Sequence, residues 1–76
     1  MRPIHEIAAE IERSWPKPYF GFVPYLTALK QLKTIDDQYG WDSGESIVRY
    51  ALGNMHTFRG PDARRLKQEL KQHLKA

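Results

Sequence analysis

Cysteine is absent from the 76-residue sequence, and this absence excludes several kinds of structure and chemistry at once. Disulfide bonds, thiolate nucleophiles and cysteine-ligated zinc sites all require that residue. Long apolar runs are missing too, because charged residues interrupt the first 15 residues, and we expect neither a signal-peptide core nor a membrane span there. The sequence therefore favours a cytoplasmic protein with no membrane partner, held together by side-chain packing alone.

The residue spacings that catalysis and metal binding use are missing as well. The three histidines lie on different segments, without the i, i+4 spacing of a metal-binding helix, and there is no glycine-rich phosphate loop. Four acids near position 40 could hold a hard cation weakly, although helix capping explains two of them without one; they are Asp36, Asp37, Asp42 and Glu45. We expect a non-enzymatic protein with no catalytic residue, cofactor, metal site or small-molecule substrate.

The length of the chain commits its bulky apolar residues to the core. A protein of this size buries about 60% of the surface that its unfolded chain exposes. Its free energy of unfolding should be about 4 to 11 kcal/mol, so the loss of one large core side chain is serious. The composition, 41% hydrophobic and 28% charged, is that of a globular protein rather than a disordered one. We expect one α-helical domain over residues 1–76.

Apolar residues at spacings of three and four predict a first helix over residues 3–14, which Pro16 and Pro18 would end. Residues 16–22 mix aromatic residues with prolines and a glycine, a composition that suits neither a regular helix nor a strand. The sequence therefore predicts an irregular crossing. Pro24 then fits the first turn of a second helix, because its missing amide costs nothing there. We expect this helix to continue to about residue 38.

The third helix is predicted over residues 43–56. Gly40 suits the left-handed position that ends a helix, and Asp42 with Glu45 resembles a capping box. The apolar stripe of this helix is wide, so we expect it to be the most buried helix and the centre of the bundle.

Glycines and leucines complete the predicted helical pattern. Gly44 should weaken the first turn of the third helix, and Gly53 should mark a close helix contact or a bend. The fourth helix should begin at Gly60 and Pro61 and lie on the core with a narrow leucine stripe. The predicted core comprises Ile7, Ile11, Trp15, Phe22, Leu26, Leu29, Leu32, Ile47, Val48, Ala51, Leu52, Met55, Leu66 and Leu70.

The positive charge of the protein is concentrated in this last segment. Residues 59–76 hold six cations against two anions, and residues 1–58 hold six against seven, so net charges of +4 and −1 give the overall +3. Cations repeated along one side of a helix can follow a phosphate backbone. The candidate nucleic-acid-binding residues are Arg59, Arg64, Lys67, Lys71 and Lys75.

Two other interpretations of the basic segment remain open. It is also typical of a solvated helix, in which Arg65 and Glu69 form an i, i+4 ion pair. A helix-turn-helix is the sharper form of the nucleic-acid hypothesis, with Arg64, Arg65 and Gln68 directed at base edges.

The aromatic crossing is the second candidate surface. Its rings could stack nucleobases or capture a peptide, because Tyr and Phe offer flat faces at little entropic cost. In a short chain most of the nine aromatic residues are also needed to fill the core. The candidate protein-binding residues are Tyr19, Phe20 and Tyr25.

Three segments, PYFGFVPYLTAL, IDDQYGWDSGESIVRYAL and TFRGPDARRLKQELKQHL, resemble a group of short, functionally uncharacterised helical proteins encoded in bacteria, phages and mobile elements. That group has an aromatic segment before a helix, an aspartate-serine helix start and an arginine-glycine joint before a basic last helix. The resemblance covers most of the chain from Trp15 onward. It implies a bacterial or phage cytosolic setting and supplies no functional residue. Gly44 departs from the alanine-rich start of the third helix in that group.

These observations predict an all-α protein, a small bundle of three to four helices with an irregular aromatic and proline crossing between the first two. The function that they favour is that of a non-enzymatic interaction module, because small helical domains often supplement a thin core by association. Its partner would be another protein or a second copy of itself. The alternative is a nucleic-acid-binding protein that uses the basic last helix.

Overall fold

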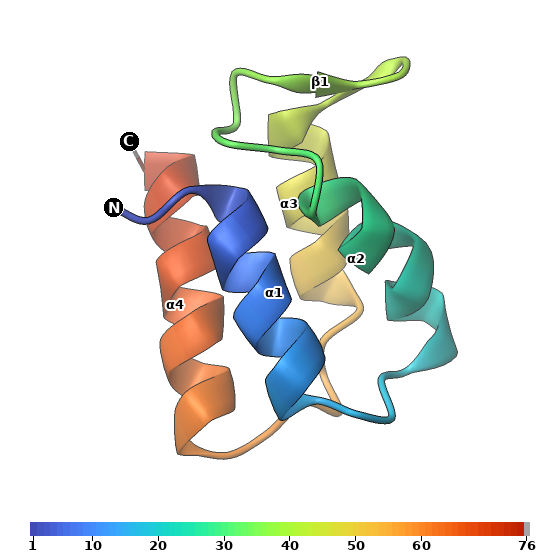
Figure 1. Cartoon of the computed structure of the whole chain (residues 1–76), viewed down its shortest axis with the longest axis vertical. Coiled ribbons are helices and arrows are strands. Elements are labelled where there is room, and N and C mark those ends of the chain that lie inside the picture. The colour runs from blue at the N-terminus through green and yellow to red at the C-terminus, as the bar shows by residue number, and fades with distance from the viewer. Residues whose placement is uncertain (76) are drawn as a thin grey trace.

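A computed structural model describes residues 1–75 and contains four α-helices, one short 3₁₀ helix and one two-stranded sheet (Figure 1). The sheet is a hairpin above one end of the helices, and the N-terminus and the end of the last helix lie close to that same end (Figure 1). The elements in chain order are α1 (Ile4–Ser14), η1 (Phe20–Phe22), α2 (Val23–Leu29), β1 (Gln38–Tyr39), β2 (Asp42–Ser43), α3 (Gly44–Gly53) and α4 (Pro61–Lys75).

Each α-helix packs against two others, so no helix occupies a centre. The α1 helix contacts α4 and α2, and α3 contacts the same two helices from the other side. The prediction that the third helix is the centre of the bundle is therefore wrong, and α1 and α3 each bury four residues. Four helices that each present one apolar stripe can close around a shared core without enclosing any of them.

The predicted core is largely confirmed, with exceptions at its edge. Trp15 and Leu52 are only partly buried and pack against the core from outside. Several residues outside the predicted set are buried with it, among them Phe58, in the loop before α4, and His73, which is 3% exposed. The Nε2 atom of His73 donates to the carbonyl oxygen of Arg2 at 2.7 Å, which satisfies its buried polar atom and holds the N-terminal segment against α4.

The prediction of an all-α protein is confirmed only in part, because α2 ends at Leu29 and the chain then forms turns and a hairpin. Residues 30–38 were expected to be helical. Instead the carbonyl oxygens of Leu32 and Lys33 accept hydrogen bonds from the backbone amides of His5 and Ile4, at 2.8 and 2.9 Å. Leu32 stays fully buried in this arrangement, so the turn keeps the apolar contact that the longer helix would have made.

The hairpin has a two-residue turn at Gly40 and Trp41. Its antiparallel register pairs Gln38 with Ser43 and Tyr39 with Asp42. Gly40 has φ +61°, as the sequence indicated, but this left-handed residue begins a hairpin turn and does not end a helix. A positive φ at the first turn residue alone is the sign pattern of a type II′ turn, which matches the twist of the two strands.

The predicted capping box at the start of α3 is also replaced by another arrangement. Ser43 is the N-cap, because its Oγ accepts a hydrogen bond from the backbone amide of Ser46 at 3.1 Å. Glu45 turns away from the backbone, and one of its carboxylate oxygens accepts hydrogen bonds from Arg49 at 3.0 and 3.1 Å. The close helix contact predicted at Gly53 is absent, since among the described residues no atom outside its chain neighbours and the nearby backbone of α3 comes within 4 Å of an added Cβ.

Ion pairs join α1 to α4 along one side of the molecule. Arg2 donates to both carboxylate oxygens of Glu69, at 2.8 and 2.7 Å, and its Nη2 lies 2.9 Å from Glu10 Oε1. Arg65 pairs with the same two acids and lies 3.6 Å from Asp62. Such a network of bidentate pairs fixes the register of the two helices more than it adds stability, because its members are partly exposed.

Acid should weaken this network through Glu10. Arg65 first and Arg2 second hold the pKa of the Glu10 carboxyl below its ordinary value. The folded protein therefore binds this proton less readily than the unfolded chain does. The stability that Glu10 contributes is complete above its unfolded pKa of about 4 and is lost as the pH falls through the lower folded value. We expect the urea midpoint to fall between neutral pH and about pH 3, and less steeply in Glu10→Gln.

Glu6→Gln is the matched control, since Glu6 is an exposed acid of α1 that joins no ion pair within residues 1–75. This variant should keep the pH dependence of the unchanged protein. If the urea midpoint fell equally steeply with pH in Glu10→Gln and Glu6→Gln, the role given to Glu10 would be contradicted.

Candidate nucleic-acid interface

The α4 helix carries charged residues on two sides, and only those on one side form ion pairs. One side faces α1 and holds Asp62, Arg65 and Glu69 in the ion-pair network. The other side, together with the loop residue before the helix, holds the predicted nucleic-acid-binding residues. We call these residues the cation row: Arg59, Arg64, Lys67, Lys71 and Lys75.

No member of the cation row forms an ion pair with any acid among residues 1–75. Four of the five are exposed, and Lys67 is half-buried. The separation from Arg65 follows from helix geometry: at 100° per residue the helical members fall within about 100° of one another, and Arg65 lies beyond them toward α1. The sequence placed the row on one face, and the fold adds that no acid within residues 1–75 lies close enough to pair with it.

Lys67 shows how close the cations come to one another. Burial first, and then the charges of Lys71 and Arg59, lower the pKa of its ammonium group. The Nζ atom lies 5.9 Å from the centre of the Phe58 ring, within the range of a cation–π contact. Three uncompensated positive charges therefore repel one another from the loop to the middle of α4, and an anion bound beside them would relieve that repulsion.

The length of the row is suited to an extended polyanion. From Arg64 to Lys75 the helix rises about 16 Å, and side chains three or four positions apart are separated by about 5 to 6 Å at their Cβ atoms. Point charges at this interval can meet successive phosphates of a nucleic-acid backbone. A compact anion would meet only one or two of them.

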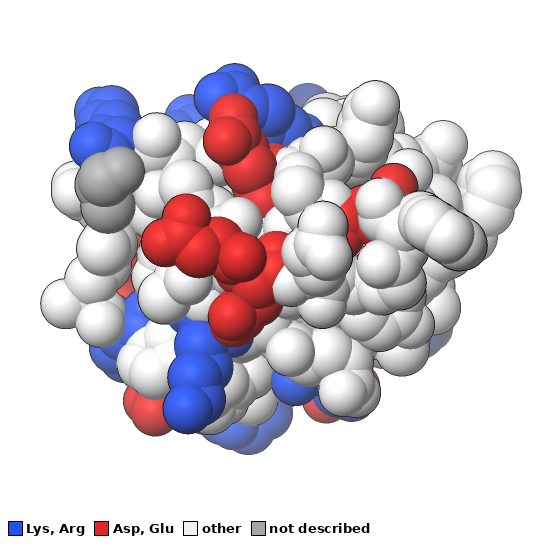
Figure 2. All heavy atoms as spheres, turned by 90° about the horizontal axis from the view of Figure 1, so that it is seen from above, with Lys and Arg blue, Asp and Glu red and all other residues white. Residues whose placement is uncertain are grey.

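The end of the molecule that carries the hairpin has the opposite character. Figure 2 looks onto this end, and the red spheres of Asp and Glu lie in the middle of the face while blue spheres lie toward its edges. The hairpin and its flanks supply Asp36, Asp37, Asp42 and Glu45, the acids that the sequence suggested as a weak cation site. Residues 1–75 contain no group of three or more potential metal ligands that could hold an ion. A polyanion would be repelled from this end.

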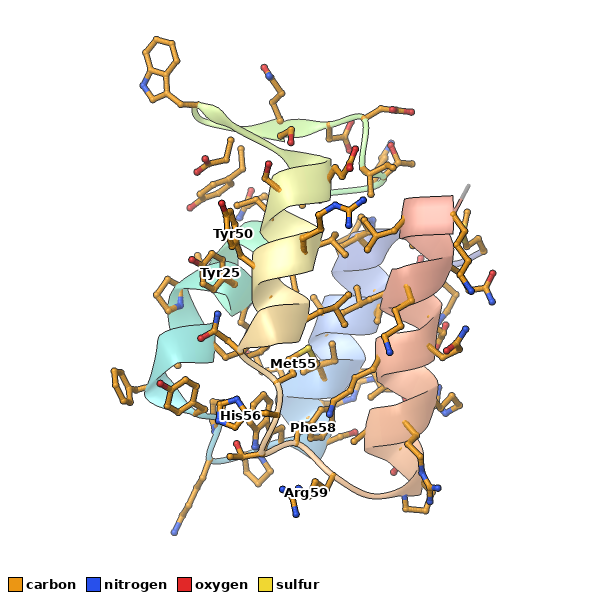
Figure 3. All side chains as sticks on the ribbon, turned by 180° about the vertical axis from the view of Figure 1, so that it is seen from behind. Tyr25, Tyr50, Met55, His56, Phe58 and Arg59 are labelled. Carbon is orange, nitrogen blue, oxygen red and sulfur yellow. The ribbon has the colours of Figure 1, made fainter. Side chains whose placement is uncertain are left out.

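The predicted protein-binding residues separate into two places. Tyr25, on α2, stacks on Tyr50 of α3 with their ring centres 6.1 Å apart (Figure 3). Tyr19 contacts the edge of His56, which lies on the loop that also carries Phe58 and Arg59 (Figure 3). Phe20 is 79% exposed beside Tyr19. The fold thus brings the Tyr19–Phe20 pair to the loop at which the cation row begins, and Tyr25 to a different helix face.

Three exposed aromatic residues, Tyr39, Trp41 and Tyr50, were outside the predicted sites. Trp41 is fully exposed at the hairpin turn, and Tyr50 is 60% exposed on α3. The sequence offered a signal for Trp41, because a tryptophan beside the glycine of a two-residue turn has no core to enter. Tyr50 occupies a helix position between buried ones and was not distinguished from them.

Other kinds of site find no counterpart in the described residues. Residues 1–75 form no pocket for a small molecule, and none of their helices combines the length and apolar character that crossing a membrane requires. Comparisons of this chain with protein-family models, with curated proteins and with solved structures find no match, so a function has to be argued from geometry and charge.

Proposed function

We propose that this chain binds nucleic acid through the cation row, with the exposed side of α4 laid along the phosphate backbone. One observation carries the proposal: all five cations of the row lack an acidic partner within residues 1–75, although the neighbouring Arg65 has three. If these cations served only to keep the helix soluble, there would be no need for the unpaired ones to lie together on one side of α4 and the paired one on the other. An uncompensated row of positive charge attracts polyanions strongly.

The sequence favoured a protein partner first and nucleic acid second, and the arrangement of charge is our reason for reversing that order. Of the proposed protein-binding residues, Tyr25 is already stacked on Tyr50. The remaining exposed ring, Phe20, lies near the basic loop and not on a separate apolar face. An acidic protein would be attracted to the same positive charge, so its binding is an outcome of the test.

The test is a titration of the protein against mixed-sequence single-stranded and duplex DNA at several salt concentrations. If about four phosphates are neutralised, the affinity for duplex should fall about a hundredfold for a fourfold rise in salt. Arg64→Gln with Lys71→Gln removes two contacts, so the logarithmic salt slope should decrease by about 2 and the affinity at about 50 mM salt by roughly tenfold to a hundredfold. Both side chains are exposed and unpaired within residues 1–75, so the fold should be kept.

The matched control is Arg13→Gln with Lys33→Gln, which removes the same charge from exposed positions outside the row. This variant should retain the salt slope and most of the affinity. Absence of binding at low salt, or equal losses in the two double variants, would overturn the proposal. Tighter binding to polyglutamate than to DNA of equal charge would point instead to an acidic protein as the partner.

A further inference from the structure

We infer that the nucleic acid is single-stranded, with one base stacked on the exposed ring of Phe20 while the backbone phosphates follow the cation row. This inference rests on the proposed function and adds the class of ligand. It assigns a base-stacking site to residues on η1 and on the loop between α3 and α4.

A continuous set of contacts joins Phe20 to the first cation of the row. The ring centres of Phe20 and Tyr19 are 4.8 Å apart, and those of Tyr19 and His56 are 5.2 Å apart. The carbonyl oxygen of His56 in turn accepts a hydrogen bond from Arg59 Nε at 3.4 Å. Aromatic faces and positive charge therefore meet on one stretch of surface, the combination that single-strand binding proteins use.

Phe20 is available for stacking in a way that the other phenylalanines are not. Phe22 and Phe58 are buried and packed on Trp15, whereas Phe20 is 79% exposed and touches Tyr19 on one side. The core is therefore complete without Phe20, whose open side can accept another flat ring. Tyr19, which makes an edge contact with His56, lies against Phe20 with the two ring planes tilted by 56°.

Stacking on Phe20 requires a base whose face is uncovered, and this requirement favours a single strand over a duplex. In a duplex the faces of the bases are covered by their neighbours, so only the phosphates would be in reach of this surface. A single strand offers unstacked bases beside its phosphates. Trp41, which is fully exposed, is a poorer platform, because it lies at the hairpin turn next to Asp42 and far in the chain from the cation row.

Phe20→Ala is the variant that tests the stacking site, with an oligothymidylate of about 15 nucleotides as the probe. Loss of one stacked base should lower the affinity by at least about fivefold at constant salt, with the salt slope unchanged. Trp41→Ala removes an exposed ring elsewhere and should bind as the unchanged protein does. On an abasic oligonucleotide of the same length, Phe20→Ala and the unchanged protein should bind alike. Retention of the far-ultraviolet circular dichroism spectrum confirms that each variant is folded.

The outcomes separate this inference from the proposal on which it rests. If Phe20→Ala binds oligothymidylate within twofold of the unchanged protein while Arg64→Gln with Lys71→Gln does not, the stacking site is wrong and the cation row stands. An equal loss for Phe20→Ala on duplex, or on the abasic strand, would likewise overturn base stacking. If no nucleic acid binds at low salt, both are wrong.

Discussion

Gly44→Ala should lower the free energy of unfolding by about 2 to 3 kcal/mol, a large share of the total for a chain of this size. The reason is backbone crowding at the start of α3. An added Cβ would lie 2.8 Å from the carbonyl oxygen of Thr34, 2.9 Å from that of Asp37 and 3.0 Å from the Cα of Ile35. All three are backbone atoms and cannot swing aside as the end of a side chain can. The hydrogen bond from the Gly44 amide to the Asp37 carbonyl, 2.7 Å long, would have to lengthen as well.

Gly53→Ala is the control, because it makes the same chemical change at the other end of the same helix. Nothing described lies within 4 Å of the added methyl group there, and alanine favours helix by up to about 1 kcal/mol. In equilibrium unfolding by urea, the free energy of unfolding should therefore be lower for Gly44→Ala and higher for Gly53→Ala than for the unchanged protein. A Gly44→Ala protein as stable as Gly53→Ala would contradict the close approach of the two backbone segments.

The contrast between these glycines shows where the sequence was informative about the fold. Helix α1 and the start of α4 were predicted within one residue, since the apolar periodicity of both helices is long and prolines mark these boundaries. The segment after Leu29 was predicted as helix because Leu32 and Ile35 continue the spacing. Its true partners, the amides of Ile4 and His5, are nearly thirty residues away in the sequence, and no local pattern encodes a contact at that separation.

The short strands escaped prediction for a related reason. Two residues in each strand are too few to show an alternation of polar and apolar side chains. The remaining signal was the Gly40–Trp41 dipeptide, which fits a two-residue hairpin turn as well as it fits the end of a helix. Because the preceding helix was extended too far, its supposed end fell on Gly40. The misplaced end of the second helix therefore led both to a helix that is too long and to a missed hairpin.

The candidate site was predictable in its composition but not in its electrostatics. Spacing placed the cations of α4 on one face, whereas the burial of His73 beside Leu66 and Leu70 was not predicted. Whether a cation is paired depends on which acids other helices bring near it. Glu10 is 55 residues from Arg65 in the sequence, and only the packing of α1 on α4 brings the two together.

Phe58→Ala should cause the largest loss of stability among these variants, about 3 to 5 kcal/mol. Phe58 is 4% exposed, although it lies in a loop without helical periodicity. Its ring stacks on Trp15 with centres 4.8 Å apart and an angle of 12° between the planes, and Trp15 in turn contacts Phe22 at 5.1 Å. Removing the ring opens a cavity where α1, η1 and the loop meet. It also removes the aromatic face below Lys67.

The measurement is urea unfolding in a Trp41→Phe background, in which Trp15 is the single tryptophan and reports on the stack directly. Phe20→Ala serves as control, since the loss of an exposed ring should change stability by less than about 0.5 kcal/mol. Phe58→Leu should fall between the two and keeps the prediction testable if Phe58→Ala does not fold. A loss below about 1 kcal/mol for Phe58→Ala would mean that the loop ring is dispensable. The anchoring of the loop that carries His56 and Arg59 would then need another source.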